Sequence, residues 1–345
     1  MGDPVDWAES AISYETFVRQ ADGIPIPQSS SPKIIAAMLR LLDVQPGMRV
    51  LEVGTGSGYS TAMLAYLVGK TGYVVSLDID SDLVERATRL LTSQGFDMVK
   101  VVAKDGREGY LPAAPFDRLI VWATGDALSP AWVEQVRKKG VIVAPIRLLP
   151  LANTTAITRV WIDCDRIPKG EKLIPGGFVP LSNQPRYQWH GYAEEADLAV
   201  LENYQPVAWV SSQWLRSEKA AQHKPKFLYL LQTACRQDSP LQDNEDVMGL
   251  RAYLLANNPH GLTTASTPSL GLGSAIGISQ PDSLALLSEF DHAYVKAGTD
   301  AAAITLASWI DNWRAVGKPG FEQLRLILNK IPSRWTVQAK LPLFE

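Results

Sequence analysis

Short apolar runs alternate with amphipathic segments over the first half of the chain. The runs are too short for helices and end in Gly, Asp or Pro, which is typical of buried parallel strands. They predict strands at Val50–Val53, Tyr73–Leu77, Val99–Ala103, Asp117–Ala123 and Val141–Pro145. The segments between them predict helices at Ser60–Val68, Ser81–Leu91 and Pro130–Lys139, the last closed by Gly140. This order predicts an α/β fold, a Rossmann-like doubly wound and mostly parallel sheet with helices on both faces.

The first predicted strand runs into a glycine-rich loop, in the sequence VLEVGTGSGY. Glycines stand at every second position, Gly54, Gly56 and Gly58, and Glu52 precedes them. Glycine lets the backbone approach a ligand closely, and a helix start behind such a loop suits a nucleotide-like ligand. The pattern alone is ambiguous, because dinucleotide-binding folds use related loops and some of these loops bind nothing.

An acidic residue, Asp78, follows the second predicted strand. At this place in a doubly wound sheet, a carboxylate binds the hydroxyls of a ribose. The alternative is that Asp78 and Asp80 only cap the helix that follows, since Asp and Ser favour such positions. Both roles are compatible, with Asp78 on the ligand and Asp80 or Ser81 as the cap.

The order of these segments resembles class I S-adenosylmethionine-dependent methyltransferases, in the sequences LEVGTGSGY, LDID, KDG, PFDRLIV and GVIVAPI. The segment Gly23–Leu42, GIPIPQSSSPKIIAAMLRLL, resembles the T-I-S-x-P element and helix of protein-L-isoaspartate O-methyltransferases. In addition, GGFVPL at Gly176–Leu181 resembles the closing F-V-P-L strand of that family. The resemblance covers roughly residues 15–190 and implies S-adenosylmethionine as the cofactor.

The family element carries a serine beside the methyl donor, and matching its proline to Pro32 places that serine at Ser30. We therefore expect Ser30 to be the catalytic hydroxyl, with Ser29 and Ser31 as one-position alternatives. Any one of these serines is also a good N-cap for the helix behind Pro32. The sequence departs from the family at Lys33, where an aromatic residue or His is common. The residues that the resemblance implies for donor binding are Gln28 (in place of the usual Thr), Ser29, Ser30, Glu52, Gly54, Thr55, Gly56, Ser57, Asp78, Ile79, Asp105, Gly106 and Ser182.

Methyl transfer to a carboxylate needs few catalytic groups. A carboxylate with a pKa near 4 is ionised at pH 7, so the reaction needs no general base. The site has to hold the oxygen in line with the methyl group and exclude water. No histidine precedes His190, which fits this chemistry better than a phenol or amine methyltransferase that depends on a histidine base.

The remainder of the chain predicts an additional C-terminal α+β domain. We expect a catalytic domain at 1–205, a linker at 206–222 and an accessory domain at 223–345. The predicted elements are a strand or helix at Phe227–Arg236, helices at Asp246–Asn257, Pro281–Lys296 and Thr299–Val316, and strands at Gln323–Leu328 and Trp335–Leu341. Leu270–Ile278 alternates apolar residues with Gly and Ala, which predicts a strand packed on a helix. The alternative is a bare strand face or edge that accepts an extended peptide.

Composition limits the partners of the protein. The net charge of −3 gives no electrostatic signal for nucleic acid, and the basic run at 137–139 suits a helix C-terminus. Only Cys164 and Cys235 occur, which favours a reducing compartment, and we expect a cytoplasmic protein without a signal peptide or a membrane span. The histidines are spaced too widely for a metal site and are His190, His223, His260 and His292.

These features predict an S-adenosylmethionine-dependent O-methyltransferase of an Asp or isoAsp carboxylate in a peptide or protein. The family resemblance implies that the ester can collapse to a succinimide. The triple serine and the added domain resemble the branch that modifies ribosomally synthesised peptides, so we favour peptide maturation over isoaspartyl repair. Two rival classes of function are a small-molecule O-methyltransferase and a non-catalytic binding module. The complete glycine loop together with Asp78 and Asp105 argues against the module.

Overall fold

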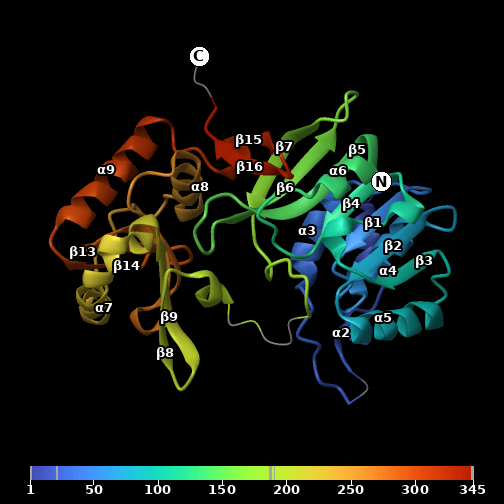
Figure 1. Ribbon diagram of the computed structural model, residues 1–345, viewed down its shortest axis with the longest axis horizontal. Helices are drawn as coiled ribbons and strands as arrows, with labels where there is room; N and C mark the ends of the chain where they lie inside the picture. Colours follow the sequence, from blue (N-terminus) through green and yellow to red (C-terminus); the bar gives the residue numbers. More distant parts are fainter. Residues whose placement is uncertain (1, 21, 186–188, 190, 343–345) are drawn as a thin grey trace. The chain divides into compact units, whose positions relative to one another are not determined.

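The computed structural model describes residues 2–20, 22–185, 189 and 191–342, and the chain divides into two compact units (Figure 1). The first unit comprises Met1–Ile146, Ala156–Tyr187 and Leu326–Val337. The second comprises Arg147–Thr155, Gln188–Arg325 and Gln338–Glu345. Each unit has its own seven-stranded sheet.

The sheet of the first unit has the strand order β3-β2-β1-β4-β5-β6-β7. Its strands are β1 (Arg49–Val53), β2 (Tyr73–Asp78), β3 (Val99–Ala103), β4 (Phe116–Val121), β5 (Val136–Arg147), β6 (Thr155–Ile162) and β7 (Pro168–Pro175). The pairs among β1 to β5 are parallel, and β6 pairs with β7 in antiparallel register. The mostly parallel, Rossmann-like sheet is confirmed, and it brings the carboxyl ends of β1, β2 and β4 to one edge.

Helices cover both faces of this sheet. They are α1 (Pro4–Ala11), α2 (Tyr14–Val18), α3 (Pro32–Leu42), α4 (Tyr59–Val68), α5 (Ser81–Ser93) and α6 (Pro130–Gln135). The first five share one apolar cluster with Val50, Val74 and Ile120 of the sheet. The opposite face carries Val53, which packs against the short 3-10 turn η1 (Gly106–Glu108), and α6 contacts η1. Alternation of side chains along each strand places these two sets on opposite faces.

The prediction of a helix over Pro130–Lys139 is wrong beyond Gln135. Val136 already pairs with Phe116, and the basic residues at 137–139 belong to β5 instead of a helix terminus. Arg137 forms an ion pair with Asp117, Nε to Oδ1 2.6 Å. A tertiary partner on β4 therefore overrides the local helical pattern.

The second unit contains a fully antiparallel sheet in the order β10-β14-β13-β12-β11-β9-β8 (Figure 1). Its strands are β8 (Leu198–Glu202), β9 (Gln205–Ser212), β10 (Cys235–Gln237), β11 (Leu262–Thr267), β12 (Leu272–Gln280), β13 (Ser283–Ser288) and β14 (Tyr294–Gly298). Its helices are α7 (Lys224–Thr233), α8 (Val247–Asn257) and α9 (Ala301–Ala315). Helix α7 packs on β13 and β14, and α9 packs on β12 and β13. The two-stranded pair β15 (Arg325–Ile331) and β16 (Arg334–Lys340) follows near the end of the chain.

Several predictions for this part of the chain differ from the structure. The segment 206–222, expected as a linker, forms most of β9 and two 3-10 turns, because β9 pairs with both β8 and β11. The predicted helix at Pro281–Lys296 is wrong, since this stretch contains β13 and the start of β14. All six residues of β13 are buried, so the run has no polar face to show a period.

The glycine-rich stretch near residue 275 is a strand, as predicted, and packs against α9. The alternative of a free edge is wrong, because β12 is hydrogen-bonded to β11 on one side and β13 on the other. A Cβ added at Gly277 would lie 2.1 Å from the carbonyl oxygen of Ala285. The missing side chain at Gly277 therefore serves close packing within the sheet. No helix among the described residues is long and apolar enough to cross a membrane.

Candidate active site

The glycine loop between β1 and α4 has a backbone that only glycine adopts easily. Gly54, Gly56 and Gly58 all have positive φ, at 95°, 51° and 86°. A Cβ added at Gly56 would lie 2.6 Å from the carbonyl oxygen of Gln28, a distance that no real side chain tolerates. The loop and the segment that leads to the serines, distant in sequence, are therefore in direct contact at this edge of the sheet.

Asp78, at the end of β2, joins this loop to the next helix. Its Oδ2 accepts a hydrogen bond from the Gly56 amide at 2.8 Å, and its Oδ1 accepts one from the Asp80 amide at 3.0 Å. Burial raises the pKa of Asp78 above its ordinary value, while the bond from Gly56 opposes the rise. Asp80 caps α5 through the amides of Asp82 and Leu83, as predicted. The two aspartates therefore have different roles.

Glu52 lies beneath the loop, is fully buried and accepts four hydrogen bonds from uncharged donors. The donors are the Ser60 hydroxyl at 2.6 Å, the Ser76 hydroxyl at 2.7 Å, the Trp122 indole at 2.8 Å and the Thr61 hydroxyl. Burial raises the pKa of Glu52, against the effect of these bonds. With every lone pair engaged, this carboxylate supports the loop from below. The expected direct contact of Glu52 with the donor does not fit this geometry.

The three serines before α3 have different environments. The Ser29 hydroxyl is buried and has no hydrogen-bond partner. The Ser30 carbonyl accepts a hydrogen bond from the Tyr14 hydroxyl at 3.2 Å. Ser31 is the N-cap residue of α3, yet its side chain makes no capping bond. The alternative that one of these serines caps α3 through its side chain is therefore not supported at the N-cap position, and the hydroxyls remain available for a ligand.

Sequence reasoning missed a clamp that holds the N-terminal segment on the glycine loop. Arg86 of α5 donates to the Ser57 carbonyl at 3.0 Å, to that of Phe17 at 2.7 Å and to that of Arg19 at 2.8 Å. Burial lowers the pKa of this guanidinium. The ring of Tyr59 stands edge-on to that of Tyr14, centroids 5.0 Å apart. An arginine on a helix looks like a surface residue in the sequence, so only the fold reveals this role.

The remaining predicted residues lie around the same edge. The Thr55 hydroxyl lies 2.6 Å from that of Ser76, and Ile79 is half-buried. Gly106 packs on Val53, and its carbonyl accepts a bond from the Trp132 indole at 2.8 Å. Asp105 caps η1 and pairs with Arg107, which lowers the pKa of Asp105. The carboxylate of Asp105 is thus already occupied by a cation.

The segment predicted as a closing strand, at 176–181, forms a single bridge from Pro180 to Thr124 instead. The Thr124 hydroxyl donates to the Phe178 carbonyl at 2.8 Å, and the Leu181 amide donates to the Thr124 carbonyl at 2.8 Å. Prolines cannot donate hydrogen bonds and so interrupt a regular ladder. Ser182 follows directly, and its hydroxyl accepts a bond from the Gln184 amide at 3.1 Å. The bridge fixes this segment to the end of β4.

Comparison with known proteins agrees with this geometry. The sequence profile of the protein-L-isoaspartate(D-aspartate) O-methyltransferases matches residues 7–185. The chain belongs to this family. It is 37% identical over 155 residues to the protein-L-isoaspartate O-methyltransferase of Ignicoccus hospitalis, covering 44% of this chain and 71% of that one. To the enzyme of the same name from Methanococcus maripaludis strain C5, it is 37% identical over 172 residues, 50% of this chain and 79% of that one.

Membership makes the chain an S-adenosylmethionine-dependent O-methyltransferase. A solved structure titled protein-L-isoaspartate O-methyltransferase covers 98% of this chain and 95% of its own, with a TM-score of 0.50 and 18% identity. At this identity the likeness shows the fold alone, and it extends over both units. Among the described residues, no group of three or more His, Cys, Asp or Glu side chains could hold a metal ion, and His190 lies outside these residues.

Proposed function

We propose that this protein transfers the methyl group of S-adenosylmethionine to the α-carboxyl group of an isoaspartyl residue in proteins and peptides. The observation that carries the proposal is the contact between Gly56 and Gln28, which brings the serine segment onto the glycine loop. Donor loop and acceptor segment meet there, as an in-line transfer between two bound groups requires.

The residues at the strand ends suit the donor. The three positive-φ glycines leave space where side chains would collide, and Asp78 provides a carboxylate for ribose hydroxyls. The buried, unpartnered hydroxyl of Ser29 is a polar group that lacks a partner until a ligand supplies one. When bound, S-adenosylmethionine supplies an electrophilic methyl group on a positively charged sulfur. The carboxylates of Asp78 and Glu52, which are bonded to uncharged donors only, favour a positive ligand nearby.

The acceptor needs orientation and no proton transfer. Its carboxylate is ionised at neutral pH, so one oxygen is already a nucleophile. We assign the Ser30 hydroxyl to donate a hydrogen bond to the other oxygen, while Tyr14 holds the Ser30 carbonyl and so fixes the backbone. Ser29 and Ser31 are the alternatives. The positions of these groups, instead of acid–base chemistry, then provide the acceleration.

The methyl ester that forms can be attacked by the next backbone amide, which gives a succinimide and releases methanol. In a repair role, hydrolysis of the succinimide returns part of the isoaspartate to aspartate. We place repair ahead of maturation of a ribosomally made peptide, because the matched relatives are named protein-L-isoaspartate O-methyltransferases and a structure of the same name shares the fold of both units. The added unit therefore does not by itself point to a dedicated peptide.

We further propose that the second unit contributes to recognition of the protein substrate.

Cys164 and Cys235 are both free and exposed, which supports a reducing compartment such as the cytoplasm.

The test incubates the purified chain with S-adenosylmethionine and two peptides that differ only in isoAsp or Asp at one position. Mass spectrometry follows the gain of a methyl group and the later loss of methanol. We expect methylation of the isoAsp peptide alone, and none by the Asp78→Ala variant. Methylation of the Asp peptide alone would favour peptide maturation instead. Donor binding without turnover of either peptide would contradict the proposed substrate.

A further inference from the structure

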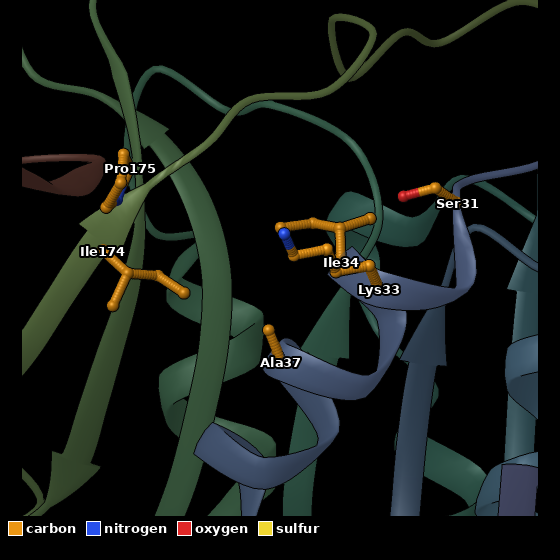
Figure 2. Close-up of a pocket in the computed structure, with 6 residues that line it drawn as sticks. All are labelled: Ser31, Lys33, Ile34, Ala37, Ile174 and Pro175. Atoms are coloured by element: carbon orange, nitrogen blue, oxygen red, sulfur yellow. The ribbon is translucent and has the colours of Figure 1, made fainter. Parts of the chain in front are cut away.

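A small hollow lies beside the serine segment, between α3 and the end of β7 (Figure 2). Its volume is about 290 Å³. Pockets for drug-sized ligands occupy about 300–1,000 Å³, so this hollow suits a single amino-acid side chain. The lining residues all belong to the first unit and are Ser31, Lys33, Ile34, Ala37, Ile174 and Pro175.

The two sides of the hollow differ in chemistry. Ile34 and Ile174 provide apolar surface and pack against the core of the unit. Ser31 and Lys33 provide polar groups from the first turn of α3, and Figure 2 shows the Lys33 ammonium directed into the hollow. Lys33 is exposed and forms no ion pair within the described part of the chain. An amphipathic side chain with a negative end matches this combination.

The hollow also borders the segment that carries the proposed acceptor serine. Ser31 lines it, and Ser31 directly follows Ser30, which we assign to the acceptor carboxylate. A peptide whose isoaspartyl carboxyl group lies at Ser30 therefore places a neighbouring residue at the hollow. This step rests on the proposed function.

The acceptor carboxylate itself is a poor partner for Lys33. The reaction converts a negative carboxylate into a neutral ester, so its charge declines on the way to the transition state. A cation on that group would stabilise the ground state more than the transition state and slow the reaction. The carboxylate of a neighbouring Asp or Glu keeps its charge throughout the reaction, so pairing it with Lys33 does not slow methyl transfer.

We propose that this hollow is a specificity subsite for an acidic residue next to the acceptor. The methylene groups of the Asp or Glu side chain lie along Ile34 and Ile174, and its carboxylate pairs with Lys33. The interaction is equal in the ground and transition states, so it lowers KM and leaves kcat unchanged. For a partly exposed ion pair we expect an effect of about fivefold, which weakens at high salt.

The experiment uses isoAsp peptides that carry Glu, Gln or Lys at one of the two positions on either side of the acceptor. Wild type is compared with Lys33→Gln and with Lys33→Glu, and the matched control is Lys70→Gln, which changes an exposed lysine elsewhere in the same unit. We expect KM to be about fivefold lower for Glu than for Gln at one position in wild type and control. Lys33→Gln should remove the preference, and Lys33→Glu should transfer it to a peptide with Lys at that position.

A second variant tests the hollow independently of charge. Ala37→Phe fills it from α3 and should raise KM for the preferred peptide without changing donor affinity in calorimetry. Equal KM for Glu and Gln peptides at all positions in wild type, or a preference that survives Lys33→Gln, would overturn the subsite. In either case the isoAsp peptides are still methylated, so the proposed function stands. If donor binds and no isoAsp peptide is methylated, the proposed function itself fails and the subsite fails with it.

Discussion

Two carboxylates at the candidate site and two buried carboxylates of the second unit differ in their hydrogen-bond partners. In the first unit, Glu52 and Asp78 accept hydrogen bonds from hydroxyl, indole and backbone N–H groups, and burial raises the pKa of each. In the second unit, Glu245 pairs with Arg314 (2.7 Å) and Lys318 (2.9 Å). Glu289 pairs there with Arg251.

The pKa of Glu245 is well below its ordinary range, mainly because Arg314 donates hydrogen bonds to it. An arginine neutralises a buried acid and contributes to stability once the pair is complete. Uncharged donors satisfy the acid but leave its negative charge in place. The first unit thus retains negative charge at the edge where we place a positively charged donor. The difference teaches that the partners of an acid decide its use: acids paired with cations contribute to stability, whereas acids with uncharged partners lie where we propose that the ligand binds.

The largest expected effect comes from removing the Asp78 carboxylate at the end of β2. Asp78→Ala should reduce affinity for S-adenosylmethionine by more than about 100-fold, because both the ribose contact and the bond to the Gly56 amide disappear. Calorimetry measures the loss, and Asp82→Ala, at an exposed position four residues on, is the control. Because the pKa of Asp78 is raised, wild-type affinity should fall with decreasing pH before an ordinary aspartate would protonate. Unchanged affinity of Asp78→Ala for S-adenosylmethionine would show that the donor does not bind at this edge of the sheet.

Glu245→Gln removes the negative charge from a buried acid that is paired with two cations. We expect a loss of about 2 kcal/mol in the free energy of unfolding of the second unit at pH 7, since Arg314 and Lys318 lose their counter-charge but remain partly exposed. The folded-state pKa is lowered, so the carboxylate stabilises the fold above its ordinary value of 4.5 and loses this contribution as the pH falls. In urea titrations, the difference in the free energy of unfolding between wild type and Glu245→Gln should therefore be smaller at pH 3.5 than at pH 7. Glu218→Gln, on the surface, is the control, and a pH-independent gap would contradict the assignment.

Ser30→Ala tests whether an uncharged donor also orients the acceptor. We expect kcat to fall by about tenfold, because the acceptor oxygen is then held less well in line with the methyl group. Donor affinity should be unchanged, because we assign the Ser30 hydroxyl to the acceptor. Steady-state kinetics with the isoAsp peptide and calorimetry with S-adenosylmethionine separate the two effects. Full turnover would transfer the role to Ser29 or Ser31, which the same substitution tests in turn.

Glu52→Gln should have the smallest effect, a loss below about 1 kcal/mol in the free energy of unfolding of the first unit. The Thr61 and Ser76 hydroxyls can rotate to accept from the new amide, while the Trp122 indole still meets an oxygen. Since burial raises the pKa of Glu52, ionisation costs stability in the folded state. The free energy of unfolding of the wild type should therefore decrease relative to that of the Gln variant as pH rises. A large loss in the Gln variant at every pH would mean that the charge itself is structural.

Glu52→Gln also tests whether the negative charge of Glu52 favours a positively charged ligand. Glu52→Gln should weaken binding of the cationic S-adenosylmethionine more than that of its neutral product, S-adenosylhomocysteine, by about threefold at pH 8. Calorimetry with both ligands gives the ratio. Equal changes for the two ligands would show that the donor site does not use this charge.

The sequence by itself determined the parallel half of the first unit. Short apolar runs closed by Gly, Asp or Pro have few ways to fold, so the strands near β1 to β4 and the capping role of Asp80 were predicted correctly. The prediction failed at β13, where all six residues are buried, so the run has no polar face that separates a strand from a helix. It also failed at β9, which pairs with β11, a strand distant in the sequence that a local pattern does not reveal.

Only the tertiary structure decided the burial and the partners of each proposed site residue. Glu52 and Asp78 both stand near the carboxyl end of a predicted strand, yet one has every lone pair engaged beneath the loop while the other lies at the strand edge. Likewise, the three adjacent serines differ only in burial and partners, and the Arg86 clamp joins residues almost seventy positions apart. Hydrogen-bond partners and burial arise from contacts between distant segments, and a local pattern records neither.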